Sequence, residues 1–176
     1  MNAQQISMKT RQTRRLTIEP LDSNDAAFTM AILNDPDFIA FVGDREIRTV
    51  DDAKKYIVDR ILPHYREHGF GMAAVRRRDN GETIGMCGLV NRDSLNYIDI
   101  GYAFLPSARG EGFALEACQE VMEMGKSDVG LDELAAIISP ENKASRALAV
   151  KLGMKLELMV RLEPDEQEVC LYLWQR

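Results

Sequence analysis

The sequence predicts one α/β domain of the mixed α+β type, in which a central, mostly antiparallel mixed sheet of about seven strands is flanked by about four helices. Several short segments alternate apolar and polar residues, as half-buried strands do. Other segments carry apolar residues three or four positions apart, which is typical of amphipathic helices. The 176 residues contain no repeat, low-complexity tract or linker, and this length suits a single compact domain.

The first half of the domain is expected to supply three strands and two helices. Residues 1–12 are polar and are expected to be a disordered leader, so that the domain covers residues 13–176. Helix starts are indicated at Asp22 or Ser23 and at Thr49. The turn Asp79-Asn80-Gly81 predicts a hairpin between two of the strands. The three expected strands are 15–20, 69–75 and 83–90.

The second half is expected to add four strands and two helices. A glycine-containing turn separates the first of these strands from an amphipathic helix, and Pro140-Glu141-Asn142 starts the second helix. The expected strands are 97–104, 133–138, 154–162 and 167–174, and the expected helices are 115–126 and 140–153.

Composition narrows the classes of function. The net charge of -6 and the pI near 5.0 argue against a general nucleic-acid binder. No apolar run approaches the ~20 residues that a membrane helix needs, and Met1 to Arg15 lack the apolar core of a signal peptide. Cys87, Cys118 and Cys170 lie in apolar segments and fit reduced core thiols. We therefore expect a cytoplasmic protein that binds neither nucleic acid nor membrane.

The segment Arg109-Gly110-Glu111-Gly112-Phe113-Ala114 is the most informative feature of the sequence. It joins an expected strand to an expected helix. The first N–H groups of a helix have no intrahelical partner, and the helix dipole adds partial positive charge there. Glycine lets that backbone approach a bulky ligand closely. The turn therefore predicts a site for a ligand that carries phosphate groups.

Two common phosphate sites do not fit this turn. An NTPase loop needs Gly-Lys-Ser/Thr, which the chain lacks. A dinucleotide site needs a third glycine near Leu115 and an acid at the end of the next strand. The nearby acids, Asp132 and Glu133, stand at the start of that strand. A dinucleotide oxidoreductase is therefore disfavoured.

The glycine turn resembles the acyl-CoA site of the GNAT (Gcn-related) N-acetyltransferases, whose motif Gln/Arg-x-x-Gly-x-Gly/Ala follows the fourth strand. The segment Ser139 to Leu148, followed by Lys151 to Met154, is similar to the next strand and helix of that family. The opening Thr13 to Ile18 and the strand Ile100-Gly101-Tyr102 resemble the branch that acetylates the N-termini of ribosomal proteins.

This resemblance implies an acyltransferase that moves an acetyl group from acetyl-CoA to a primary amine, either a protein N-terminus or a small molecule, with no metal. It implies that Asn142 contacts the cofactor and that Ser145 reaches the departing sulfur. The pantetheine arm would pair with the strand edge at Phe104 and Leu105. The expected cofactor-binding residues are Phe104, Leu105, Arg109, Gly110, Gly112, Phe113, Ala114, Asn142 and Ser145. The protein would be a monomer or a homodimer.

Asp99 and Ser145 are the candidate catalytic residues. In an alternating strand Asp99 shares one face with Tyr97, Gly101 and Ala103. Burial beside the cofactor would raise the pKa of Asp99 toward the range of a general base. Members of the family often carry Glu there, and Asp is shorter by about one carbon. Tyr102 and Tyr97 are candidates for a general acid or for lining the groove, because the helix after Asn142 carries no tyrosine.

Two other interpretations remain open at this point. His64-Tyr65-Arg66-Glu67-His68 matches a metalloprotease pattern, but these are the only two histidines in the chain. A non-catalytic acyl-CoA-binding module that regulates a partner is the alternative to an enzyme. The absent helix tyrosine and the Asp in place of Glu are the features that favour it.

Overall fold

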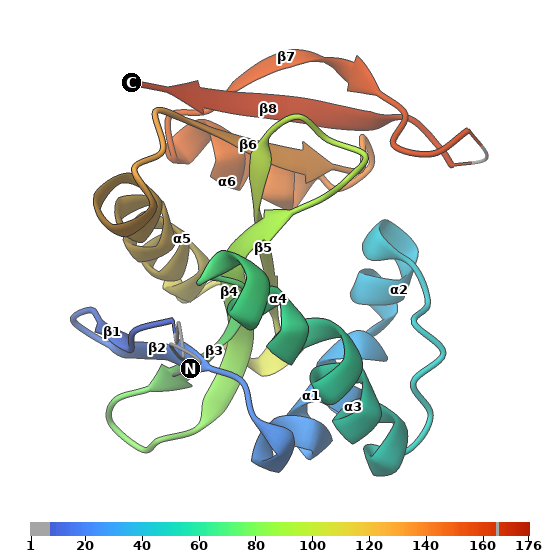
Figure 1. Cartoon of the computed structure of the whole chain (residues 1–176), viewed down its shortest axis with the longest axis vertical. Coiled ribbons are helices and arrows are strands. Elements are labelled where there is room, and N and C mark those ends of the chain that lie inside the picture. Colours follow the sequence, from blue (N-terminus) through green and yellow to red (C-terminus); the bar gives the residue numbers. More distant parts are fainter. Residues whose placement is uncertain (1–7, 165) are drawn as a thin grey trace, which may run out of the picture.

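The computed structural model describes residues 8–164 and 166–176, which form one mixed α/β domain around an eight-stranded sheet (Figure 1). The strand order is β1-β2-β3-β4-β5-β6-β8-β7, and every neighbouring pair is antiparallel except β5 and β6. The predicted fold class is confirmed. The strands are β1 (Arg11–Gln12), β2 (Leu16–Pro20), β3 (Met72–Arg77), β4 (Thr83–Asn91), β5 (Ile98–Phe104), β6 (Glu133–Ile138), β7 (Lys155–Val160) and β8 (Val169–Gln175).

The prediction that the disordered leader extends to residue 12 is wrong, because ordered structure begins before that residue. Met8 is only 4% exposed, and Arg11 and Gln12 form β1 against Ile18 and Thr17 of β2. Polar residues order this strand, because the Arg11 guanidinium binds Glu120 at 2.7 Å on a distant helix. An apolar pattern therefore does not reveal the strand. Residues 1–7 of the expected leader lie outside the described residues.

The helices occupy the two faces of the sheet. They are α1 (Ala26–Leu33), α2 (Pro36–Val42), α3 (Val50–Tyr56), α4 (Leu62–His68), α5 (Phe113–Met124) and α6 (Lys143–Lys151). Short 3-10 turns cover 23–25 and 106–108, and π-helical turns cover 57–61 and 125–129. In Figure 1, α5 lies on one side of the central strands, while α3 and α4 lie on the other.

One helical difference affects the site. The Asn34-Asp35-Pro36 stop ends α1 as expected, but it also starts α2, because Asp35 is the N-cap and proline is tolerated in the first turn. Residues of α2 line a cleft beside Tyr102, Ala103 and Phe104 of β5. The helix expected from Thr49 runs as predicted, through a π-helical turn into α4, and ends before Gly69, which has φ of 76°.

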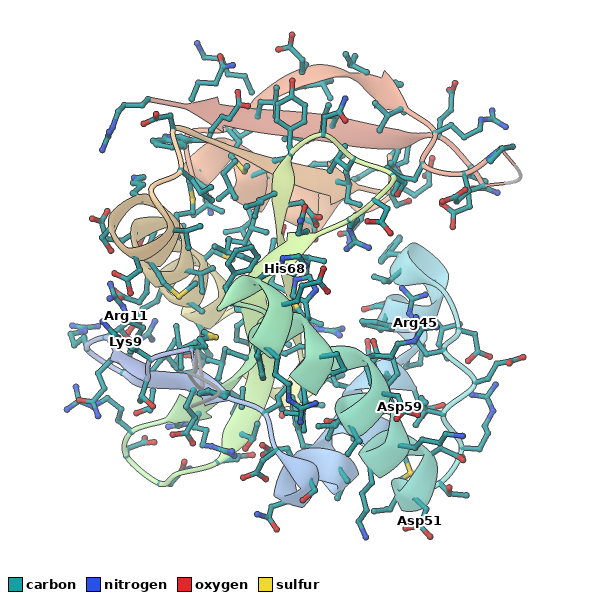
Figure 2. The ribbon with its side chains drawn as sticks, viewed as in Figure 1. Lys9, Arg11, Arg45, Asp51, Asp59 and His68 are labelled. Atoms are coloured by element: carbon teal, nitrogen blue, oxygen red, sulfur yellow. The ribbon has the colours of Figure 1, made fainter. Side chains whose placement is uncertain are left out.

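The sheet separates between β5 and β6. These parallel strands share one register pair, Asp99 with Ala135, although β5 continues to Phe104. The carboxyl half of β5 therefore has a free edge that faces α6 and α2. Parallel strands that part in this way leave a crevice at their carboxyl ends. Figure 2 labels Lys9 and Arg11 at β1, and Arg45, Asp51 and Asp59 on the helical side of the molecule.

The core joins both helical layers to the central strands. Leu16, Ile18, Leu89 and Leu134 are among the fully buried side chains. The three cysteines are free and buried, as expected.

Candidate active site

The glycine turn has the geometry that its sequence predicts. Gly110 and Gly112 have φ of 81° and 78°, in the left-handed region that favours glycine. Helix α5 begins directly after Gly112, and its first cap bond runs from the Glu116 N–H to the Gly112 carbonyl at 3.1 Å. The earlier N–H groups in the turn have no preceding helical carbonyl to bind. Their positions and the helix dipole suit an anionic ligand.

A cleft of about 520 Å³ begins at this turn and continues between β5, α2 and α6. We refer to it as the cofactor cleft. Most of the expected cofactor residues line it: Phe104, Arg109, Gly110, Gly112, Phe113, Ala114, Asn142 and Ser145.

Leu105 is the exception, because it is not among the residues that line the cleft. Its N–H donates to the Ile84 carbonyl at 2.9 Å and is therefore used within the sheet. Backbone groups alternate between the two edges of a strand. The Phe104 carbonyl accepts from Arg109 at 3.0 Å on the edge away from β4. The Phe104 N–H consequently faces the open edge of β5, where a ligand can pair with it.

Arg109 holds the walls of the cofactor cleft together. Its Nη2 lies 2.6 Å from Asp35, the N-cap of α2, and its Nη1 lies 2.5 Å from Asp37 in the first turn of that helix. A third bond runs to the Phe104 carbonyl. These contacts occupy the guanidinium and attach α2 to the glycine turn. Arg109 therefore holds the cleft walls in place.

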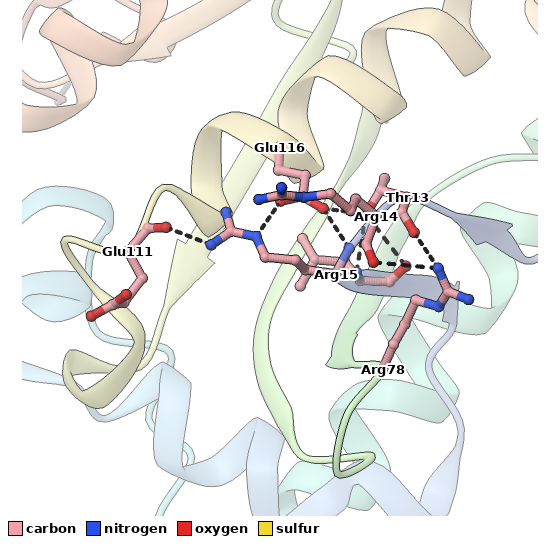
Figure 3. A network of polar contacts seen from close by, with 7 residues as sticks. Thr13, Arg14, Arg15, Arg78, Glu111 and Glu116 are labelled. Carbon is pink, nitrogen blue, oxygen red and sulfur yellow. Dashed lines mark hydrogen bonds and ion pairs between the residues drawn. The ribbon is translucent and has the colours of Figure 1, made fainter.

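A polar network that the sequence did not reveal supports the turn from outside (Figure 3). The Arg15 Nε lies 2.7 Å from Glu116 of α5, and the Arg15 Nη1 donates to the Glu111 carbonyl at 2.9 Å. Thr13 Oγ1 donates to the same glutamate at 2.6 Å. The Arg15 guanidinium also lies 4.4 Å above the Phe113 ring. Two segments about a hundred positions apart thus fix the start of α5.

Asn142 and Ser145 lie where the cofactor cleft approaches β5. Asn142 Oδ1 caps α6 by accepting from the Ser145 N–H at 3.1 Å. The Tyr102 hydroxyl donates to the Ser145 carbonyl at 3.2 Å. Burial raises the pKa of Tyr102, so its hydroxyl stays protonated at neutral pH. The side chains of Tyr102 and Asn142 therefore both bond to the backbone of Ser145.

A second cleft of about 610 Å³ meets the first at this point. We refer to it as the acceptor cleft. The two share Tyr102, Ala103, Asn142 and Ser145, together with residues of α2. Helices α2 to α4 form one wall of the acceptor cleft, and the other contains β5, the end of β6 and the β7–β8 connection. Ligands in the two clefts would be neighbours at the carboxyl half of β5.

Asp99 lies in the acceptor cleft and is 1% exposed. Its carboxylate binds Arg92, with Nε 2.8 Å from Oδ1. Burial is the main influence and raises the pKa of Asp99, while the charge and hydrogen bond of Arg92 oppose that rise. Asp99 is the second residue of β5, so it lies nearer the amino end of the strand than Tyr102 and Ala103, which line both clefts. The Arg92 partner was not anticipated, because it follows β4 and reaches across the loop between the two strands.

The remaining candidates lie outside the junction. Tyr97 packs in a separate apolar cluster with Ala135 and Leu171. His64 and His68 share α4, with ring centroids 4.4 Å apart. Residues 8–164 and 166–176 contain no group of three or more His, Cys, Asp or Glu placed to hold a metal ion. In this same part of the chain, no helix is sufficiently long and apolar to cross a membrane.

Comparison with known proteins identifies the family. Residues 15–155 match the model of the acetyltransferase (GNAT) domain. The chain is 26% identical to the uncharacterised N-acetyltransferase YoaA of Bacillus subtilis over 151 residues, which cover 85% of each protein. Its fold matches an acetyltransferase from Agrobacterium tumefaciens with a TM-score of 0.82 and 24% identity, covering 97% and 96% of the two chains.

A second solved structure with this fold contains the cofactor. The ribosomal alpha-N-protein acetyltransferase RimL, in complex with coenzyme A, matches with a TM-score of 0.79 and 18% identity. The match covers 95% of this chain and 98% of RimL. The domain match, the relatives and the shared fold agree with the motifs at the glycine turn and at Asn142. The chain therefore belongs to the GNAT acetyltransferase family and is an acyltransferase.

Proposed function

We propose that this protein is an N-acetyltransferase that moves the acetyl group of acetyl-CoA to a primary amine by direct attack. The meeting of two clefts at the carboxyl half of β5, one of them beginning at the glycine turn, carries this proposal. The coenzyme A bound to RimL and the N-acetyltransferase name of YoaA support the donor and the reaction class.

The chemistry of the cofactor cleft suits coenzyme A. The first N–H groups of α5 would bind the pyrophosphate, and Gly110 leaves the space beside its Cα open. The pantetheine arm would pair with the free edge of β5, whose Phe104 N–H faces outward. An N–H group at this edge would also stabilise the negative charge that develops on the thioester oxygen.

Asp99 of the acceptor cleft and Ser145 at the junction would accept and donate the protons of the transfer. The neutral amine nitrogen bonds to the acetyl carbon, the carbon–sulfur bond breaks, and the nitrogen loses one proton. Asp99 would receive that proton through a water molecule, because its carboxylate is nearly inaccessible. The Ser145 hydroxyl would donate a proton to the departing thiolate and regain one from water, while Asp99 returns its proton to solvent. Tyr102 would hold the Ser145 backbone in place. Positioning of the two reactants would provide most of the acceleration.

Release of free CoA, measured with acetyl-CoA and a panel of amines and N-terminal peptides, tests the reaction. We expect amine-dependent release and an acetylated amine by mass spectrometry. Tight CoA binding without release for any amine would instead support the regulatory acyl-CoA-binding module. The acceptor cleft of about 610 Å³ favours the enzyme, because such a module has no need for it.

A further inference from the structure

The acceptor cleft has opposite charges on its two walls. Arg45, from the segment after α2, and Arg60, from the π-helical turn between α3 and α4, lie on the helical wall. Asp99 of β5 and Glu166 and Glu168 of the β7–β8 connection lie on the sheet wall. Arg92 also lines the sheet wall, but it is paired with the buried Asp99, so Glu166 and Glu168 are the exposed carboxylates of this wall. A ligand that spans the cleft therefore meets Arg45 and Arg60 on one side and these two carboxylates on the other.

Arg45 and Arg60 differ from the other arginines near the two clefts. Of the other arginines that line the clefts, Arg92 binds Asp99, and Arg109 binds Asp35 and Asp37. Within residues 8–164 and 166–176, neither Arg45 nor Arg60 forms an ion pair or a side-chain hydrogen bond. Figure 2 labels Arg45 beyond α2, on the side of the molecule away from Lys9 and Arg11. Two separate elements thus place a guanidinium with unused donors at the same cleft.

We propose that this cleft selects amines that also carry a carboxylate, and that Arg45 and Arg60 bind that carboxylate. The inference rests on the proposed N-acetyltransferase function and names the substrate class of the same site. A guanidinium presents its N–H donors in a planar fork that matches a carboxylate. The acids of the sheet wall attract the ammonium end of such a molecule. The two walls together orient the amine toward the junction at Ser145 and the carboxylate away from it.

The carboxylate has two chemical sources. It belongs either to a free amino acid or to an acidic side chain near the N-terminus of a peptide. Each source has a matched neutral acceptor, namely the amino acid amide and the peptide with Asn or Gln in place of Asp or Glu. Faster turnover of the charged member of a pair than of its neutral counterpart shows selection for the carboxylate. Comparison of the amino acid pair with the peptide pair shows which of the two molecules supplies that carboxylate.

Steady-state release of CoA from these four acceptors tests the inference. For the wild-type protein we expect kcat/KM at least about tenfold higher for the carboxylate member of the preferred pair, as is usual for one charge-assisted contact. The Arg45→Gln and Arg60→Gln variants should each raise the KM of that acceptor by about tenfold, and their combination should remove the preference. The KM of acetyl-CoA and the KM of the neutral acceptor should stay unchanged.

Arg66→Gln is the matched control. Arg66 is an exposed arginine of α4 that lines neither cleft. This variant changes net charge by the same amount and should retain the preference of the wild-type protein. An equal loss in Arg66→Gln would indicate long-range attraction rather than a binding site and would overturn the inference.

The inference and the proposed function fail in different ways. Turnover of both members of each pair at equal kcat/KM would reject carboxylate selection and leave the N-acetyltransferase intact. Equal losses for charged and neutral acceptors in the arginine variants would also reject it. Absence of CoA release with every amine would reject the N-acetyltransferase and carboxylate selection together.

Discussion

The cofactor cleft and the acceptor cleft meet at the carboxyl half of β5, but one presents mainly backbone groups to its ligand and the other mainly side chains. The anion-binding end of the cofactor cleft consists of backbone N–H groups whose direction is set by Gly110 and Gly112. The selective part of the acceptor cleft consists of side chains from helices, a loop and the sheet, among them Arg45, Arg60 and Asp99. A backbone site tolerates changes in neighbouring side chains, whereas a side-chain site changes with each residue. The donor of a GNAT enzyme is therefore more readable from one sequence than its acceptor.

Substitution of Gly112 should have the largest effect on ligand binding, and that effect should fall on the cofactor cleft. Valine at φ of 78° is strained, and relief of the strain would turn the first N–H groups of α5 away from the ligand. We expect Gly112→Val to weaken CoA binding by at least about 100-fold in isothermal titration calorimetry.

Gly130→Val is the control for strain alone. Gly130 has a similar φ of 79° and lies in the turn after α5, outside both clefts. The Gly130→Val variant should have a lower free energy of unfolding but the CoA affinity of the wild-type protein. Unchanged CoA affinity in Gly112→Val would remove the glycine turn from the binding site.

Substitution of Asp99 should act on turnover without changing cofactor affinity. Asp99→Asn removes the proposed proton acceptor, so kcat should fall by about 100-fold and its rise with pH should flatten. The dissociation constant of CoA should stay unchanged, because Asp99 does not line the cofactor cleft. A wild-type pH–rate profile in this variant would contradict the role of Asp99 as a base.

Removal of Arg92 should shift the pH dependence of the reaction. The charge and hydrogen bond of Arg92 lower the pKa of Asp99 against the larger effect of burial. Arg92→Gln removes both opposing influences, so the pKa of Asp99 should rise further. A base works only when deprotonated, and the acid limb of kcat/KM should therefore move to higher pH. A limb that stays in place or moves to lower pH would show that another group titrates.

Substitutions at the start of α2, the helix that lines both clefts, should have the smallest effects, and these should be on stability. Asp35 has a side chain 5% exposed, and it binds Arg109 and caps α2, so Asp35→Asn should lower the free energy of unfolding by about 1–3 kcal/mol. Asp37 is 60% exposed, and its ion pair with Arg109 should contribute about 0–1 kcal/mol. Urea unfolding of Asp35→Asn and Asp37→Asn measures both losses. Equal losses would show that burial does not distinguish the two contacts.

The same contrast explains which features could be predicted from the sequence. The glycine turn, the Asn142 cap and the face of Asp99 follow from local rules, because two glycines, an N-cap and strand alternation each act over a few residues. The register of β1 and the support from Arg15 depend on Glu120 and Glu116, about a hundred positions away. Helix α2 was missed because Pro36 both ends one helix and starts the next. Its attachment through Arg109 joins residues more than seventy positions apart, so no local pattern indicates it.

A crystal structure with coenzyme A bound tests the central claim most directly, because the claim concerns the junction between the clefts. We predict the pyrophosphate on the N–H groups at the start of α5, the pantetheine arm along the free edge of β5, and the sulfur atom beside Tyr102 and Ser145. A sulfur atom away from the shared residues, or a pyrophosphate bound elsewhere than at the glycine turn, would contradict the account.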